Sequence, residues 1–191
     1  MSLLPLTRTC CLTDYPACPT VAHWQQHLVE EAYQRWWPSP EPDLHAEHLL
    51  LNLSEGAFLL MPEIAQAFHS FTTPEGFARY TPSVEVASVV ALAIVDHIAA
   101  PLGFLKMAAG DLRPGGLLVL TFAYWDAEGR DIAVGHAQRR RIYDRISWRR
   151  LATESERYDL HLFGGVDWTY GGHTLGDHTL ASLVLVKGAR P

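Results

Sequence analysis

Residues 84–121 constrain the fold of this chain more than any other part of the sequence. They contain an apolar run at 86–95 interrupted only by Ser88, a segment with helical spacing, a Pro-Gly-Gly sequence, and a second apolar run at 117–122. The shortness of the first run and its β-branched residues favour a strand buried on both faces, as in a parallel sheet. We therefore expect a strand–helix–strand unit with a right-handed crossover, whose two parallel strands are neighbours at the centre of the sheet.

The helix of this unit is indicated by its first residue and by its apolar face. Pro101 suits the first turn of a helix, where its missing N–H is not needed. The apolar residues that follow recur at helical spacing: Leu102, Leu105, Ala109 and Leu112. The Pro-Gly-Gly sequence at 114–116 then predicts the end of the helix and a turn into the second strand.

These residues and others downstream resemble the second half of a class I S-adenosylmethionine (SAM)-dependent methyltransferase. In that family a buried strand ends in an acidic-His pair, matched by Asp96-His97, and a basic-Pro-Gly-Gly turn, matched at 113–116, precedes a strand ending in Thr. The sequence RIYDRISWRRLA at 141–152 is similar to the family's next helix, and the run at 180–186 to its antiparallel closing strand. The resemblance implies an α/β, Rossmann-like, doubly wound and mostly parallel sheet of methyltransferase type.

The resemblance also implies a place for SAM, at a glycine-rich turn after the first strand of the fold. In HLLLNLSEGAF, Asn52 falls on the family's acidic residue and Ser54, Gly56 and Phe58 fall on its three glycines. Side chains at positions 54 and 58 obstruct the close backbone approach that glycines permit. The candidates for cofactor contact are Asn52, Ser54, Gly56 and Asp96. We expect SAM binding to be weak or absent.

The interval between Gly56 and the strand at 86 is short for this family, which places further strands and an acidic ribose-binding residue there. The sequence predicts one helix at 62–71, a turn, and no clear strand. Glu63 or Glu75 would have to make the ribose contact. We therefore expect a shortened sheet in the half of the fold that holds the cofactor.

Residues that can do chemistry follow both central strands, at the end of an open α/β sheet where ligands bind. His97 is a candidate general base, because the pKa of histidine lies near neutrality; the alternative is a histidine that caps or packs on the following helix. Tyr124 is a second candidate for proton handling. Trp125 and Tyr143 are candidate substrate-binding residues.

The N-terminal region predicts a helix with one apolar face, ended by Pro38. That face carries Val21, Trp24, Leu28, Ala32 and Trp36. The proline-rich sequence at 38–43 is the one plausible linker, so residues 1–43 are interpreted as an arm and residues 44–191 as the methyltransferase-like domain. A short helix is marginal alone, so its apolar face is expected to be buried on the domain, on a second copy of the chain or on a protein partner.

Composition argues against several partners and compartments. The net charge is −6 with mixed signs, so neither nucleic acid nor a membrane is expected as a partner. The one basic cluster, the arginine run at 139–141 followed by Arg145, Arg149 and Arg150, is interpreted as a solvated helix face. The sequence shows no membrane-length apolar run and no signal-peptide pattern. Three cysteines, two of them adjacent, do not make a disulfide framework, and a reducing cytoplasmic location is expected.

Two loose sets of potential metal ligands lack the spacing of known metal sites. They are Cys10, Cys11, Cys18 and His23 in the first set, and Asp167, His173, Asp177 and His178 in the second. Ordinary thiols and a hydrogen-bonded loop are the interpretations, and no metal site is predicted.

Two functions of different classes stay open. In the first, the chain is a methyltransferase-like protein with an eroded SAM site, used as a non-catalytic binding or assembly module that docks through its N-terminal helix. In the second, it is an active SAM-dependent methyltransferase acting on a small molecule, with His97 and either Tyr124 or Tyr143 handling the acceptor proton. The missing glycines favour the first.

Overall fold

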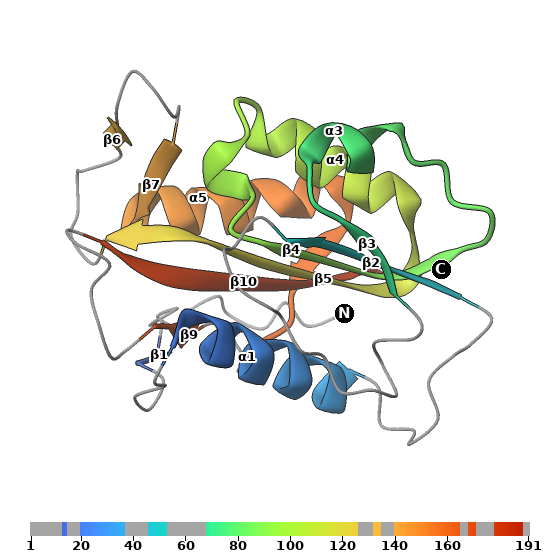
Figure 1. Ribbon diagram of the computed structural model, residues 1–191, viewed down its shortest axis with the longest axis horizontal. Helices are drawn as coiled ribbons and strands as arrows, with labels where there is room; N and C mark the ends of the chain where they lie inside the picture. The colour runs from blue at the N-terminus through green and yellow to red at the C-terminus, as the bar shows by residue number, and fades with distance from the viewer. Residues whose placement is uncertain are drawn as a thin grey trace, which may run out of the picture.

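The computed structural model describes residues 13–14, 20–36, 46–52, 68–125, 132–134, 140–164, 168–170 and 178–188. A twisted sheet forms the middle layer, and helices cover both of its faces (Figure 1). Helix α1 (Val21–Trp36) lies on one face, and α3 (Pro74–Arg79), α4 (Pro101–Asp111) and α5 (Arg145–Ser155) lie on the other. No helix in these ranges has the length and apolar character needed to cross a bilayer.

The sheet runs in the order β1-β9-β10-β5-β4-β2-β3, with β7 beside β5, β6 beside β7 and β8 beside β10. The strands are β1 (Thr13–Asp14), β2 (Glu47–Asn52), β3 (Phe68–Phe71), β4 (Val86–Leu92), β5 (Leu112–Trp125), β6 (Ile132–Val134), β7 (Arg140–Asp144), β8 (Leu160–Leu162), β9 (Trp168–Thr169) and β10 (Thr179–Lys187). Strands β3, β2, β4 and β5 are parallel to one another, and β10 is antiparallel to β5. The predicted α/β class, the parallel central pair and the antiparallel closing strand are all confirmed.

The strand–helix–strand unit predicted at 84–121 is present, with α4 joining β4 to β5. Every residue of β4 is buried, as expected for a central strand covered on both faces. The strand ends at Leu92, however, and not at residue 95 as predicted. Ala93 has a φ of 55°, and a short 3₁₀ turn, η1 (Val95–His97), follows. An apolar run cannot show where pairing stops, because the turn is buried as well.

The Pro-Gly-Gly turn exists but lies within β5. Val86 pairs with Leu112 and Ser88 with Leu117, so the residues between 112 and 117 bulge out of the ladder. Gly115 has a φ of 75°, a conformation that side chains rarely adopt. At Gly116 an added Cβ would lie 2.8 Å from the carbonyl oxygen of Arg113, so only glycine lets the backbone pack this closely.

One prediction for the cofactor half was wrong. Residues 68–71, predicted to be the end of a helix, form strand β3, which is parallel to β2 and extends the sheet by one strand. Helix α3 then begins after Thr73, whose hydroxyl caps it by accepting a hydrogen bond from the amide of Gly76. The first part of the predicted helix, 62–67, and the residues Ser54, Gly56, Phe58 and Glu63 lie outside the described residues.

Helix α1 packs against one face of the central sheet. Trp24, Leu28, Val29 and Ala32 are fully buried and belong to one core cluster. That cluster also contains sheet residues from four strands: Leu50, Val90, Leu92, Leu117, Val119, Leu180 and Val184. Trp36 is only partly buried, and its indole N–H donates a hydrogen bond to the carbonyl of Gly115 at 2.7 Å. The expected burial of Trp24 and Leu28 is confirmed, and the covering surface is the chain's own sheet.

Ser88, the one polar residue in the first apolar run, forms hydrogen bonds with two buried polar side chains beneath α1. Its Oγ lies 2.8 Å from Nδ1 of His48 on β2 and hydrogen-bonds the hydroxyl of Tyr33 on α1. All three residues are buried. Burial raises the pKa of Tyr33, and the hydrogen bond with Ser88 opposes that rise only in part. The network ties α1 to β2 and β4 without an unpaired hydroxyl.

Glu47, at the start of β2, is a buried carboxylate with several donors. Its Oε1 accepts hydrogen bonds from the amide of Ser83 at 3.1 Å and from the hydroxyl of Ser83 at 2.6 Å, and its Oε2 accepts one from Tyr80 at 2.7 Å. Burial opposes ionisation, but these hydrogen bonds and the charge of His69 outweigh it and hold the pKa of Glu47 below its usual range. Burial and the same carboxylate raise the pKa of Tyr80 to about 12.

We expect Glu47→Gln to lower the free energy of unfolding by about 1–3 kcal/mol near neutral pH, because the charge-assisted hydrogen bonds are lost. The folded-state pKa is depressed, so the stabilisation is fully present above the unfolded pKa of about 4.3 and is lost as pH falls through the folded value. Urea unfolding of both proteins across this range should therefore show the two stabilities converging in acid. Glu85→Gln, at an exposed position, is the control, and a constant difference at all pH values would contradict the prediction.

Candidate functional site

The strand order reverses at β2, which places a topological switch point between β2 and β4. From β2 the chain continues to β3 on one side, and β4 lies on the other. At the carboxyl ends, Asn52 is paired in register with Leu92, and Leu92 with Thr121. In open α/β sheets, ligands bind outside the carboxyl ends of the strands at such a point. The edge formed by the ends of β2, β4 and β5 is therefore the candidate functional site.

Helix α1 contributes a side chain to this edge that the sequence interpretation missed. Gln25 is fully buried and donates a hydrogen bond from Nε2 to Oγ1 of Thr121 at 3.1 Å. The same Oγ1 also accepts one from the amide of Ala93 at 3.0 Å. Oε1 of Gln25 is buried and has no hydrogen-bond partner within the described part of the chain. Its spacing in the sequence could have indicated this burial, because Gln25 lies four residues after Val21 and four before Val29, on the apolar face of the helix.

Asp96 and His97 lie at the carboxyl end of β4, as predicted, but in different environments. Asp96 is fully buried, whereas the side chain of His97 is 34% exposed. The ring nitrogen Nε2 of His97 lies 3.7 Å from Oδ2 of Asp96. The backbone of η1 fixes this pair, because the amide of His97 donates a hydrogen bond to the carbonyl of Ile94 at 2.8 Å. Of the two side chains, only that of His97 is accessible to a ligand.

Tyr124, Trp125 and Tyr143 come together because β7 pairs in parallel with the end of β5. Tyr124 is paired with Tyr143 and Trp125 with Asp144. The two tyrosines are buried and Trp125 is half-buried. The hydroxyl of Tyr143 lies 3.5 Å from the carbonyl of Val95 in η1, which links β7 to the segment that carries Asp96 and His97. The catalytic roles of His97 and Tyr124 and the substrate-binding roles of Trp125 and Tyr143 remain predictions.

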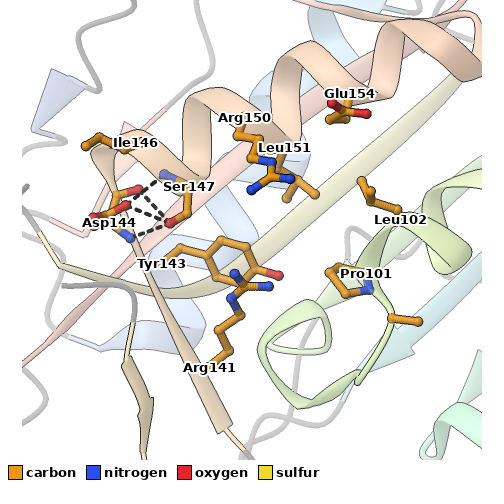
Figure 2. Close-up of a pocket in the computed structure, with 11 residues that line it drawn as sticks. Pro101, Leu102, Arg141, Tyr143, Asp144, Ile146, Ser147, Arg150, Leu151 and Glu154 are labelled. Atoms are coloured by element: carbon orange, nitrogen blue, oxygen red, sulfur yellow. Dashed lines mark hydrogen bonds between the residues drawn. The ribbon is translucent and has the colours of Figure 1, made fainter. Parts of the chain in front are cut away.

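A cavity of about 620 Å³ opens beside these residues, between the start of α4, strand β7 and helix α5 (Figure 2). Its lining residues are Ala100, Pro101, Leu102, Arg141, Tyr143, Asp144, Ile146, Ser147, Arg150, Leu151 and Glu154. Tyr143 is the predicted site residue among them. The guanidinium of Arg141 lies over the Tyr143 ring, 5.2 Å from its centroid. Arg141 and Arg150 were missed, because the arginines of this region were interpreted as a solvated helix face. That interpretation was wrong for Arg141, which lies on strand β7.

The start of α5 is held by a reciprocal cap. Oδ1 of Asp144 accepts a hydrogen bond from the amide of Ser147 at 2.7 Å, and the hydroxyl of Ser147 accepts one from the amide of Asp144 at 2.8 Å. This is a capping box, with a short polar pair at the two positions. The carboxylate of Asp144, which lines the cavity, is therefore already engaged by the protein's own amide and hydroxyl groups.

Among the described residues, the ends of β2 and β3 offer few acceptors for the ribose hydroxyls of a cofactor. Asn52, half-buried at the end of β2, presents an amide. After β3 come Thr72 and Thr73, and the hydroxyl of Thr73 is engaged in the cap of α3. Glu75, the nearest carboxylate along the chain, lies in the first turn of α3 and is exposed. Within the described ranges, no three His, Cys, Asp or Glu side chains are grouped closely enough to hold a metal ion.

No protein-family model and no curated protein matches the chain. Among solved structures, it resembles a SAM-dependent methyltransferase from Clostridium acetobutylicum ATCC 824, with a TM-score of 0.53 and 9% identity over 87% of this chain and 91% of that one. It also resembles the glycopeptide N-methyltransferase MtfA complexed with S-adenosyl-L-homocysteine, with a TM-score of 0.51 and 12% identity over 93% of this chain and 92% of that one. The [4+2]-cyclase SpnF has a TM-score of 0.51 and 12% identity over 93% of this chain and 100% of that one. The fold of this chain is therefore that of the class I SAM-dependent methyltransferases, as the sequence resemblance implied.

Proposed function

We propose that this chain is a methyltransferase-like protein whose SAM site is eroded and which serves as a non-catalytic binding or assembly module. The observation that carries the proposal is the donor and acceptor set at the ends of β2 and β3. Asn52 and the two threonines after β3 offer an amide and hydroxyls, whereas two ribose hydroxyls are best bound by a carboxylate. The residues present do not fit SAM well.

The sequence after β2 supports the same conclusion. Ser54 and Phe58 stand where two glycines would let the backbone approach the methionine end of the cofactor. A phenyl ring at the third position adds bulk where the ligand needs bare main chain. Loss of both the close approach and the carboxylate would weaken binding at the two ends of the cofactor together.

The fold itself does not require methyl transfer. SpnF is a [4+2]-cyclase, and its structure matches 93% of this chain. Function resides in the site and not in the scaffold. A retained sheet with altered strand ends is therefore compatible with a binding role.

The alternative is an active SAM-dependent methyltransferase acting on a small molecule, and two observations favour it. Strand β3 restores part of the cofactor half that the sequence suggested was missing. His97 is partly exposed at the end of β4, where it could take a proton from an acceptor, with Tyr124 or Tyr143 nearby. SAM, if bound, would supply the methyl group, and alignment would be the main demand on the protein.

For assembly, the surface that α1 offers to a partner is its outer side, since Trp24 and Leu28 are buried on the sheet. A protein partner or second copy of the chain would contact exposed residues such as His23, His27 and Arg35. We expect no nucleic acid and no membrane among its partners.

Isothermal titration with SAM and with its demethylated product tests the proposal. We expect a dissociation constant no better than about 100 μM, equivalent to about −5.5 kcal/mol. The Gly56→Val variant is the control, because it should change little if the pocket is already eroded. A dissociation constant of a few micromolar that Gly56→Val abolishes would favour the active enzyme.

A further inference from the structure

The cavity between α4, β7 and α5 has one apolar wall and one cationic wall. Pro101 and Leu102 from α4 supply the apolar wall, together with Leu151. Arg141 and Arg150 supply the cationic one, and Figure 2 shows their side chains directed toward the space around the Tyr143 ring. A volume of about 620 Å³ is in the range of small-molecule sites.

The carboxylates that line this cavity do not neutralise Arg150. Asp144 is buried and caps α5 through Ser147. Oε2 of Glu154 lies 2.6 Å from a guanidinium nitrogen of Arg157, so its charge is paired away from the cavity. Arg150 is exposed and forms no ion pair within the described residues. Its guanidinium therefore remains available to an anion.

Tyr143 completes the site by placing an aromatic surface between the two walls. Its ring stacks against the guanidinium of Arg141, and its hydroxyl approaches the carbonyl of Val95. A ligand with an apolar body can lie against Tyr143, Pro101 and Leu102 while its charged end reaches an arginine. A planar guanidinium matches a carboxylate with two parallel hydrogen bonds.

We propose that this cavity binds a small organic carboxylate, with the carboxylate held by Arg150 and Arg141 and the apolar body packed on Tyr143, Pro101 and Leu102. None of the residues that line this cavity is among the expected SAM contacts, which are Asn52, Ser54, Gly56 and Asp96. The proposed site therefore does not depend on whether SAM binds, and the proposed function can fail without this inference failing.

Phenylacetate, its neutral amide phenylacetamide, and inorganic phosphate are suitable probes, titrated without SAM into the ¹⁵N-labelled full chain. Saturable shifts of the amides of Tyr143, Ser147 and Arg150 are expected with phenylacetate. Phenylacetamide should bind about ten-fold more weakly, because the charge-assisted hydrogen bonds are missing. Phenylacetate affinity should fall when the salt concentration is raised from about 0.05 M to 0.5 M.

A pair of neighbouring arginines supplies the matched variants. Arg150→Ala should weaken phenylacetate binding by about ten-fold or more, whereas Arg149→Ala, also exposed on α5 but not a lining residue of the cavity, should leave it unchanged. Both variants should keep the wild-type unfolding temperature, which separates loss of binding from loss of folding. Arg150→Lys should fall between the two, because it keeps the charge and loses the planar fork.

Several results would overturn the inference. No saturable phenylacetate binding would do so, as would equal binding of the amide or an equal effect of the two alanine variants. Phosphate binding as tight as that of phenylacetate would show a site that recognises charge alone, and the assignment to an organic carboxylate would then be wrong.

Discussion

A chain that begins at residue 44 is expected to be unfolded or aggregated at room temperature. Helix α1 covers a sheet face made of apolar side chains that are fully buried, among them Val90, Leu92 and Val119. Burial of each such side chain contributes about 1.5–3 kcal/mol to the stability of the folded protein. Uncovering this face therefore costs on the order of 10 kcal/mol. That is comparable to the whole stability of a typical domain. Circular dichroism should show no cooperative thermal transition, and light scattering should show association.

Point variants test the packing of the apolar face of α1 without removing the segment. Leu28→Ala is expected to lower the free energy of unfolding by about 2–5 kcal/mol, because Leu28 is fully buried against the sheet. His23→Ala, on the exposed side of the same helix, should change it by no more than about 0.5 kcal/mol. A truncated chain that unfolds cooperatively at the wild-type temperature would show that α1 is a dispensable arm.

The parts of the fold that could be predicted are those in which local pattern and tertiary position agree. Strand β4 is buried on both faces, so an unbroken apolar run was sufficient to identify it. Helix α4 carries Pro101 at its start and an apolar face, two signals that depend only on neighbouring residues. The closing strand β10 is buried over most of its length for the same reason.

Strand β3 could not be predicted, because nothing local distinguishes it. It has four residues, it lies last in the order of the sheet, and His69 and Ser70 are exposed. Its strand geometry comes from pairing with β2, a long-range interaction. The apolar residues just before it have helical spacing, and the predicted helix at 62–71 followed from that spacing.

The candidate site was predicted in part, for a topological reason. Asn52 ends β2 and Asp96 follows β4, and the two strands are parallel neighbours, so their common edge could be inferred from the chain order. Gln25 and Arg150 come from helices whose docking on the sheet no sequence pattern specifies. Single polar residues on such helices are indistinguishable from solvated ones until the helices are placed.

Replacing Trp148 with alanine is expected to destabilise the protein by about 3–5 kcal/mol, the cost of removing a large side chain from a packed core. Trp148 on α5 is 1% exposed, and its indole N–H donates a hydrogen bond to the carbonyl of Ser182 on β10 at 2.9 Å. It is therefore the anchor that joins the helix bearing Arg150 to the centre of the sheet. Trp148→Phe keeps most of the apolar contact and loses the donor, so about 1–3 kcal/mol is expected.

Urea unfolding of the three proteins measures both effects, with Arg149→Ala as the exposed neighbour that should cost no more than about 0.5 kcal/mol. The order wild type, Trp148→Phe, Trp148→Ala is the expected result, because the phenylalanine variant loses the hydrogen bond and part of the ring volume only. If Trp148→Ala cost less than about 1 kcal/mol, α5 would not be held by this residue. The geometry of the cavity would then have to be fixed by the cap at Asp144 and the Tyr143 contacts alone.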